Sequence, residues 1–261
     1  RKPVQVYILA GQSNMEGHGQ VRSLETLGQS SEHRILFNAL RNENGGWAVR
    51  DDVFISWEDR RPQSGALSVG WGRNEKSIGP EFSFGTVVGD VFDAPVLLIK
   101  TAWGGKDMYC DFRSPSAGAP TKHEQALLDR EAGNGRKREV GAYYRRMLLE
   151  IQRALEGIQD LVPGYAGEGY ELAGLAWFQG WNDYCQWRTR INDEPVGMSL
   201  IERYPKNLAG LFQDLRRELD APDMPIVVGE LGIGGLEMIE RAKNEGDHEA
   251  RAIMAFRSSS T

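Results

Sequence analysis

The chain has 261 residues, a net charge of −6 and 40% hydrophobic residues, which is typical of a globular protein that buries a large core without disulfides or metals. Its acidic balance argues against nucleic acid as the main partner, because phosphate binding needs a basic face. No apolar run reaches the length of a membrane span.

The first part of the chain predicts two buried strands, separated by a long insertion and a helix. Residues 4–10 and 96–101 are short, mostly apolar runs bounded by Gly or Pro, a pattern typical of strands buried on both faces of a parallel sheet. Residues 80–91 begin with proline and continue with apolar positions at helical spacing, so we expect a helix there. Residues 20–79, with a short β-like piece at 53–57, are interpreted as a loop insertion.

The second part of the chain repeats the alternation of helix and strand. Residues 140–155 and 204–219 place apolar side chains three and four apart, which predicts two amphipathic helices. Short apolar runs at 172–178 and 226–229 predict two more strands. Residues 237–256 predict a weaker helix with a charged outer face.

This alternation predicts an α/β fold, a three-layer α/β/α sandwich with a mainly parallel central sheet. We interpret residues 1–261 as a single domain. Residues 110–138 are polar and rich in Gly and Pro, and we interpret them, like 20–79, as a loop insertion at the catalytic edge. Sites in such sheets form beyond the carboxyl ends of the strands, so the residues that follow each strand are the candidates for chemistry.

The cysteines and histidines give no sign of a metal site. Cys110 and Cys185 could form one disulfide or remain free thiols, and two cysteines are too few for structural zinc. The four histidines show no metal-ligand spacing. We therefore expect no metal site.

Ser13 is the first candidate nucleophile, because it follows the first predicted strand in a tight Gly-Gln-Ser turn. A serine at this place can attack an ester, and its backbone amide can point into the crevice and stabilise an oxyanion. A serine at the start of a helix commonly acts as a simple N-cap, and the sequence around Ser13 leaves both roles open.

The turns after the other strands could complete an oxyanion hole. Gly104 and Gly105 follow the second strand, and glycine lets a backbone amide approach a ligand closely. The side-chain amides of Gln179 and Asn182 follow the third strand. Glu230 follows the fourth, where we favour a structural role. Each motif alone is compatible with an ordinary turn, but their placement at successive strand ends favours acyl-transfer chemistry.

The Gly-Gln-Ser-Asn-Met sequence of residues 11–15 resembles the sialate O-acetylesterase-like family, which includes the acetyl-xylan esterases of carbohydrate esterase family 6, within the SGNH-hydrolase superfamily. The resemblance continues through residues 79–82, 100–105 and 177–183, so that it covers nearly the whole chain. It implies an SGNH-type fold and cofactor-free hydrolysis of acetyl esters on the hydroxyls of oligo- or polysaccharides. It also implies a secreted or periplasmic protein.

By position, the resemblance makes Ser13 the nucleophile. The oxyanion hole would consist of the amides of Ser13 and Gly105 and the side chain of Gln179, with Gly104 and Asn182 as alternatives. We prefer Gln179 because Gln-Gly is the usual form in this subfamily, although Gly-Trp-Asn-Asp also fits the wider superfamily. Further residues expected to line the substrate site are Gln12, Asn14, His18, Trp103 and Trp181.

The sequence departs from the family at the catalytic histidine. The family's late Asp-x-x-His block is missing, and Asp247 and His248 are adjacent instead. We expect the catalytic histidine and its acid to lie in a missing C-terminal segment, or to be absent from the protein. His18 and His123 are weaker candidates. A catalytically incomplete glycan-binding protein is therefore the alternative function.

Aromatic and basic residues are consistent with a sugar ligand. Tryptophan rings stack on sugar faces, although burial in the core is their commoner role. Arginines could contact an acidic sugar, but pairing with surface carboxylates is favoured. The tryptophans expected in or near the cleft loops are Trp47, Trp57, Trp71, Trp103, Trp181 and Trp187, and the arginines are Arg60, Arg61, Arg73 and Arg113.

Overall fold

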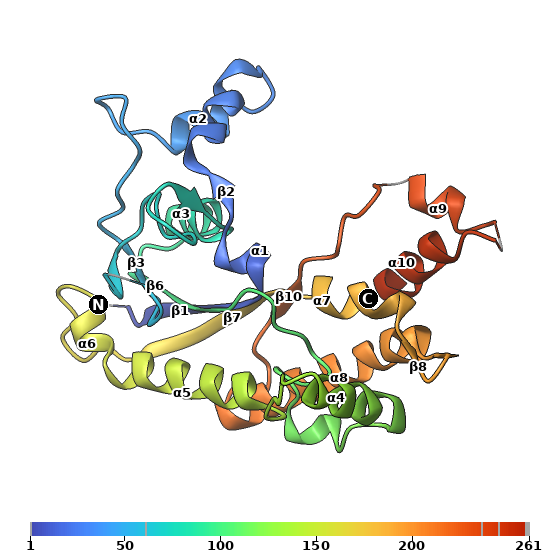
Figure 1. Cartoon of the computed structure of the whole chain (residues 1–261). Helices are drawn as coiled ribbons and strands as arrows, with labels where there is room; N and C mark the ends of the chain where they lie inside the picture. The colour runs from blue at the N-terminus through green and yellow to red at the C-terminus, as the bar shows by residue number, and fades with distance from the viewer. Residues whose placement is uncertain (1, 61, 236, 245, 259–261) are drawn as a thin grey trace. The chain divides into compact units, whose positions relative to one another are not determined.

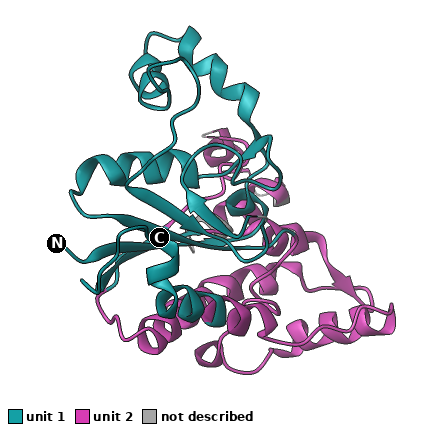
Figure 2. Ribbon diagram, turned by 90° about the vertical axis from the view of Figure 1, so that its left-hand side faces the viewer, with its two compact units in different colours: residues 1–104, 149–177, 224–227 teal, residues 105–148, 178–223, 228–261 magenta. Residues whose placement is uncertain are grey.

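A computed structural model of the chain describes residues 2–60, 62–235, 237–244 and 246–258 (Figure 1). The chain forms two compact units that are interleaved in sequence (Figure 2). Unit 1 consists of residues 1–104, 149–177 and 224–227, and unit 2 of residues 105–148, 178–223 and 228–261.

A six-stranded sheet carries the strands that the sequence predicts, in the order β10-β7-β1-β6-β3-β4. β1 and β6 are parallel, β3 is parallel to β6, and β4 is antiparallel to β3. The predicted α/β class with a mostly parallel sheet is therefore confirmed. The strands are β1 (Val4–Gly11), β3 (Val53–Ser56), β4 (Ser64–Ala66), β6 (Val96–Ala102), β7 (Tyr170–Phe178) and β10 (Ile226–Val228).

The pairing of β1 with β6 brings two predicted functional turns to one edge of the sheet. The register runs from Gln5 opposite Val96 to Gly11 opposite Ala102, so both strands end at the same level. β6 is buried along its whole length, as expected for a strand covered on both faces. The segments that follow the two strands, starting at Gln12 and Trp103, therefore leave the sheet side by side.

The insertion predicted at 20–79 contains a strand of the central sheet. β3 is fully buried and pairs with β6 from Val53 opposite Val96 onward, because four consecutive residues of Val-Phe-Ile-Ser suit a strand covered on both faces. The other elements of this region are short: β2 (Gly19–Gln20), η1 (Val21–Gln29), α2 (Arg34–Ala39) and β5 (Ser77–Ile78).

Helices lie on both sides of the strands of unit 1. Figure 1 shows α3 (Glu81–Val91) on one side, and α6 (Ile158–Leu161) with the end of α5 (Ala142–Glu156) on the other. Gly85 lets α3 approach the sheet closely, because a Cβ atom there would lie 2.3 Å from the side chain of Leu67 and 2.8 Å from that of Leu98. The predicted helices at 80–91 and 140–155 are thus confirmed.

The helices of unit 2 differ from the predictions in their limits. α8 (Gly197–Glu218) begins seven residues before the predicted 204–219 and contains Pro205. Its buried face already includes Leu200 and Ile201, and this packing outweighs the local break that proline favours. No helix in the described segments is long and apolar enough to cross a membrane.

Two other regions of unit 2 also differ. The helix predicted at 237–256 is divided into α9 (Glu237–Arg241) and α10 (His248–Ser258). The insertion predicted at 110–138 contains the 12-residue helix α4 (Lys122–Gly133), which starts with a reciprocal capping box between Thr121 and Glu124. The remaining elements are η2 (Pro115–Ala117), α7 (Trp181–Tyr184), η3 (Cys185–Arg188), β8 (Arg190–Ile191) and β9 (Glu194–Pro195).

The two cysteines are free thiols and form no disulfide with each other. Cys110 is buried and Cys185 is exposed. The fold therefore relies on its packed core rather than on a covalent link, as a chain of this length allows.

Candidate active site

Ser13 is the first residue of a single-turn helix, α1 (Ser13–Glu16), at the carboxyl end of β1. The turn is closed by two backbone hydrogen bonds, from the Glu16 amide to the Gln12 carbonyl at 2.7 Å and from the Gly17 amide to the Ser13 carbonyl at 2.9 Å. A helix this short is not stable by itself, so tertiary contacts must hold it. The strand-to-helix turn predicted around Ser13 is present.

The Ser13 hydroxyl has a neighbouring amide as its partner. Within the described part of the chain, its hydrogen bond comes from Gln12 Nε2 at 3.5 Å. The Gln12 side chain is buried and makes no capping bond to the helix. Asn14 and His18, which the sequence predicts to line the substrate site, are both exposed to solvent.

The turn after β6 lies against the serine turn in unit 1. The Trp103 amide donates to the Gly11 carbonyl at 3.2 Å. A Cβ atom on Gly104 would lie 2.7 Å from Glu16 Oε2, so this carboxylate lies directly against the Gly104 backbone. Glu16 Oε2 is also 3.5 Å from His18 Nε2. Two strand ends, a carboxylate and an imidazole thus meet around α1.

A buried ion pair holds the far end of α1. The Lys100 ammonium lies 2.8 Å from Glu81 Oε2, and both side chains are completely inaccessible to solvent. Lys100 Nζ also donates to the carbonyls of Glu16 at 3.1 Å and Trp71 at 2.8 Å, so its three hydrogens have three acceptors. Glu81 Oε1 accepts from the amide of Gly79 at 2.7 Å.

This pair is electrostatically costly on its own and depends on its hydrogen bonds. Burial lowers the pKa of Lys100, while the attraction and hydrogen bond of Glu81 raise it again and favour the charged form. Lys100 Nζ also lies 4.4 Å from the centre of the Trp57 ring. Because Lys100 binds the last carbonyl of α1, the sheet fixes the position of the serine turn.

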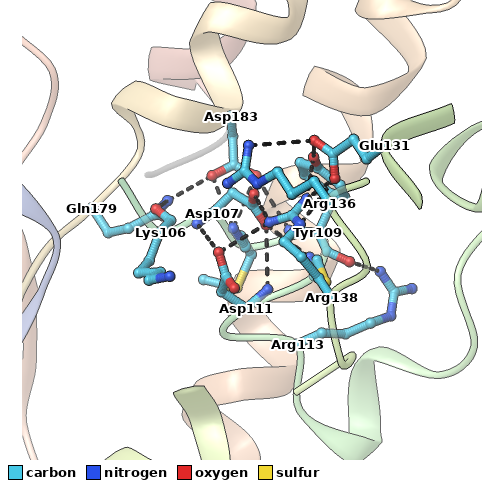
Figure 3. Close-up of polar contacts among 12 residues, drawn as sticks. Lys106, Asp107, Tyr109, Asp111, Arg113, Glu131, Arg136, Arg138, Gln179 and Asp183 are labelled. Carbon is cyan, nitrogen blue, oxygen red and sulfur yellow. Dashed lines mark hydrogen bonds and ion pairs between the residues drawn. The ribbon is translucent and has the colours of Figure 1, made fainter. Parts of the chain in front are cut away.

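In unit 2, Gln179 and Asp183 form a buried pair directly after β7 (Figure 3). Gln179 Nε2 donates to Asp183 Oδ2 at 2.6 Å and to the Lys106 carbonyl at 3.1 Å, which engages both of its hydrogens. The backbone amides of Met108 and Tyr109 also donate to Asp183, at 2.9 Å and 3.3 Å. Gln179 and Asp183 belong to the segment predicted to supply an oxyanion donor, and their hydrogen bonds hold the loop that follows Gly105 in place.

Burial raises the pKa of the Asp183 carboxyl well above its usual range, and the negative charge of Asp107 raises it further. The hydrogen bonds from Gln179 and the backbone act in the opposite direction. Asp107 also has a raised pKa, chiefly from burial, although Arg138 opposes the shift. Two buried carboxyls therefore compete for ionisation in this cluster.

Arg138 links the remaining acidic groups of the cluster, as Figure 3 shows. Its guanidinium is paired with Asp107 at 2.5 Å, Asp111 at 3.1 Å and Glu131 at 2.7 Å. It also donates to the hydroxyl of Tyr109 at 2.5 Å. These contacts tie α4 to the loop after Gly105 and make that loop a fixed part of unit 2.

Gly105 and Asn182 lie close together in unit 2. Gly105 has a φ of 76°, a left-handed conformation that favours glycine. The position of a Cβ atom on Gly105 would be 3.9 Å from Asn182 Nδ2. Both candidate side-chain amides are therefore near this turn, since Gln179 Nε2 donates to the carbonyl of the next residue, Lys106.

Among the histidine side chains that the structure describes, none is hydrogen-bonded to the Ser13 hydroxyl. His123 Nδ1 is 2.6 Å from the hydroxyl of Ser199, and its Nε2 is 3.9 Å from Glu194. His248 is the first residue of α10, and its side chain is outside the described part of the structure. No group of three or more His, Cys, Asp or Glu residues among those described could hold a metal ion.

Most of the tryptophans and arginines expected at the cleft have structural roles. Trp57, Trp71 and Trp103 are buried, and Trp47 packs against Phe37, Phe82 and Arg41. Trp181 is 45% exposed, and the exposure of Trp187 is intermediate. Arg113 is buried in an ion pair with Glu124, Arg60 donates to the Gly70 carbonyl, Arg73 is exposed, and Arg61 lies outside the described residues.

Sequence reasoning missed the Lys100–Glu81 pair and the role of Asp183. The signal for the first was a single lysine inside the apolar run that forms β6, since a charge there must be paired. Asp183 belongs to the 177–183 segment that the sequence analysis identified, but its burial depends on the loop around Met108 and could not be inferred from the spacing of residues.

A serine on a tight turn at the end of a buried parallel strand, next to a glycine turn, is typical of serine hydrolases with an α/β fold. Residues 3–258 match the family described as carbohydrate esterase, sialic acid-specific acetylesterase, and this chain belongs to that family. The resemblance seen in the sequence motifs is thereby confirmed. A comparison with curated proteins found no match.

Solved structures include similar folds. A protein from Arabidopsis thaliana is 17% identical with a TM-score of 0.51, over 98% of this chain and 96% of that one. A carbohydrate acetylesterase from Xanthomonas citri is 14% identical with a TM-score of 0.48, over 97% of this chain and 46% of that one. NanS is 13% identical with a TM-score of 0.49, over 97% of this chain and 74% of that one.

Replacing Lys100 by Met should lower the free energy of unfolding by about 3–5 kcal/mol, because the buried Glu81 carboxylate loses its counter-charge. Urea unfolding measures this change. The double variant Lys100→Met/Glu81→Gln should recover part of the loss, since Gln keeps an acceptor for the Gly79 amide without a buried charge. Equal stabilities of the single variant and the parent would contradict the assigned role.

Replacing Asp183 by Asn should flatten the pH dependence of stability. Because the folded state raises the pKa of Asp183, the proton on this group favours folding below about pH 4, and that contribution is lost as the pH rises through the raised pKa. Urea unfolding of the parent between pH 5 and 8 should therefore show a falling component that Asp183→Asn lacks. The exposed Asp223→Asn variant is the control and should keep the parent's slope.

Proposed function

We propose that the protein is a serine-dependent carbohydrate O-acetylesterase with Ser13 as its nucleophile. The observation that carries the proposal is the placement of Ser13 on a tight turn at the carboxyl end of β1, beside the Gly104 turn. In the sheet β1 lies between β6 and β7, which lead into the glycine pair and the Gln179 block. Membership of the family of carbohydrate esterases supports the reaction class.

The reaction would be an acyl transfer in two steps. Ser13 Oγ attacks the acetyl carbonyl carbon, its proton passes to a base, and the tetrahedral intermediate expels the sugar oxygen, which receives that proton. A water molecule then attacks the acetyl-serine, and acetate leaves as the Ser13 hydroxyl is restored. The base is a histidine in this chemistry, and we leave its position in the protein unassigned.

The oxyanion hole would combine two backbone amides with one side-chain amide. The amides of Ser13 and Gly105 are the backbone donors, with Gly104 as the alternative to Gly105. For the side chain we favour Asn182, because the Cβ position of Gly105 is 3.9 Å from its Nδ2. Gln179 Nε2 donates to the Lys106 carbonyl and to Asp183. Gln179 would then position Asp183 and the Lys106 loop, and it is the alternative donor.

The substrate would be an acetylated oligo- or polysaccharide, of the acetyl-xylan or O-acetyl-sialate type. Export to the periplasm or the cell exterior would suit such a substrate and is proposed from the family alone.

A glycan-binding protein without esterase activity is the second candidate function. The observation that favours it is that the Ser13 hydroxyl is bound by Gln12, rather than by a histidine, in the described part of the chain. Activity measurements separate the two candidates.

Ser13→Ala should abolish acetate release from acetylated xylan, from an O-acetylated sialic acid and from p-nitrophenyl acetate. Removal of a catalytic serine lowers kcat by several powers of ten without unfolding the protein. Acetate is measured enzymatically, and circular dichroism checks the fold. The exposed serine of α3 gives the matched control Ser83→Ala, which should keep full activity. Absence of Ser13-dependent release from all three substrates would leave the glycan-binding function.

Asn182→Ala should lower kcat about 10²- to 10³-fold with little change in KM, as expected when one oxyanion donor is lost. Gln179→Ala should have a smaller effect on kcat and should lower the melting temperature, because it removes a buried hydrogen bond to Asp183. The opposite ranking of the two variants in kcat would assign the donor to Gln179.

A further inference from the structure

Unit 2 contains a serine, a histidine and a carboxylate in hydrogen-bonding order, none of which takes part in the reaction proposed above. His123 Nδ1 is 2.6 Å from Ser199 Oγ, and His123 Nε2 is 3.9 Å from a carboxylate oxygen of Glu194. The three residues come from α4, from α8 and from the hairpin of β8 and β9, all within the same compact unit. This order of groups is that of an activated nucleophile with its base and an acid.

Buried contacts fix the helix of the histidine against the helix of the serine. The first turn of α4 is closed by the capping box between Thr121 and Glu124. Glu124 is completely buried, and its Oε1 accepts a hydrogen bond from Asn207 Nδ2 of α8 at 2.9 Å. Arg113 is paired with the same carboxylate at 2.9 Å. Because His123 precedes Glu124 in this turn, the backbone of the histidine is held beside α8 independently of its own hydrogen bond.

The Ser199 hydroxyl has one hydrogen and two acceptors. Its oxygen is 2.8 Å from the Val196 carbonyl oxygen and 2.6 Å from His123 Nδ1. When the imidazole proton is on Nε2, on the side of Glu194, Nδ1 is an acceptor that can take the serine proton. Ser199 is partly exposed, and His123 and Glu194 keep 33% and 64% of their side-chain surface, so a small reagent in solution reaches the three groups.

The start of α8 supplies donors for the negative charge that an attack on an ester creates. Ser199 is the third residue of this 22-residue helix, whose N-terminus carries a partial positive charge. The first amides of a helix have no acceptor inside the helix. Within the described residues, the amides of Met198 and Ser199 have no acceptor elsewhere either. They are therefore available to an oxyanion that forms beside Ser199 Oγ.

We propose that Ser199 is a second reactive serine, at which His123 and Glu194 promote covalent acylation by small activated esters. Ser199 Oγ attacks the carbonyl carbon of an aryl ester, and its proton passes to His123 Nδ1. The bond between the carbonyl carbon and the phenol oxygen then breaks, and the leaving phenolate takes up that proton. An acyl-serine and a phenol result, and no other reactant is needed.

The acyl group is expected to stay on Ser199 rather than turn over. In the usual serine–histidine arrangement Nε2, the ring nitrogen farther from the backbone, faces the serine. Here Nδ1 faces it, and this nitrogen is close to the Cβ atom of His123, which leaves less room for an attacking water molecule. Ser199 is therefore a modification site, separate from the acetate release assigned to Ser13.

Labelling of the Ser13→Ala chain with an alkyl fluorophosphonate tests the proposal, because Ser13 is then unable to react. A reactive serine oxygen displaces fluoride from phosphorus and forms a stable ester. Cleavage by trypsin after Arg190 and Arg203 yields residues 191–203, in which Ser199 is the only residue with a hydroxyl group. We expect mass spectrometry to find the label on this peptide, and an acetyl group on it after treatment with p-nitrophenyl acetate. An unlabelled peptide after fluorophosphonate treatment would overturn the proposal.

His123→Asn separates activation of the serine from a purely structural contact. The asparagine amide can replace Nδ1 as a hydrogen-bond partner of Ser199, but it cannot take up a proton. We expect the labelling rate of peptide 191–203 to fall about 100-fold or more, with an unchanged melting temperature. Glu194→Gln should lower the rate by a smaller factor. A labelling rate that survives His123→Asn sinks the idea.

Ser83 is a matched internal control in the same experiment. It is the third residue of α3, it is exposed, and its hydroxyl donates to the Pro80 carbonyl at 3.5 Å, as Ser199 does to Val196. In the described part of the chain no histidine is hydrogen-bonded to it. Ser83 should therefore remain unlabelled, and equal labelling of the two serines would contradict activation by His123.

The outcome is independent of the esterase test. Labelling of Ser199 without Ser13-dependent acetate release would refute the proposed activity and keep the second serine. Ser13-dependent release without any label on Ser199 would keep the activity and refute the second serine.

Discussion

The buried ion pair between Lys100 and Glu81 is the interaction on which the serine turn depends. A four-residue helix has too few internal hydrogen bonds to hold Ser13 in place. Lys100 supplies the missing constraint by binding the carbonyl of Glu16, and Glu81 fixes the ammonium while accepting from Gly79. The desolvation cost of two charges is offset only because every ammonium hydrogen has an acceptor. The position of Ser13 is thus set by the sheet and α3 rather than by local sequence.

In unit 2, the buried carboxyl that organises nearby backbone is that of Asp183. Asp183 accepts hydrogen bonds from the backbone amides of Met108 and Tyr109 and from the side-chain amide of Gln179, and so shapes the loop that follows Gly105. Burial disfavours its charge, while these hydrogen bonds favour it. Asp183 is adjacent in the chain to Asn182, whereas Glu81 acts on the Ser13 turn through Lys100. In both units a buried carboxyl thus organises the backbone near a group proposed to act on substrate.

Aromatic and basic residues show why composition alone does not locate a ligand site. Trp57 and Trp71 are enclosed, and Arg113 is buried against Glu124, so these residues stabilise the fold. Trp187 and Arg188 are of the same residue types, but they line an open groove with residues of the hairpin and the start of α8. What distinguishes the two sets is the burial and pairing of each side chain.

The sequence by itself determined the strands, the main helices and the family, because apolar runs and the Gly-Gln-Ser-Asn-Met block are local signals. It did not reveal that Val53–Ser56 is a strand of the central sheet or that α8 begins before Pro205, at Gly197, because both depend on packing between distant segments. The spacing of Gln179 and Asn182 likewise left two candidate donors. Only the tertiary structure showed that Gln179 has both hydrogens engaged and that Lys100 reaches Glu16, because hydrogen-bond partners 73 and 84 residues apart are chosen by the fold.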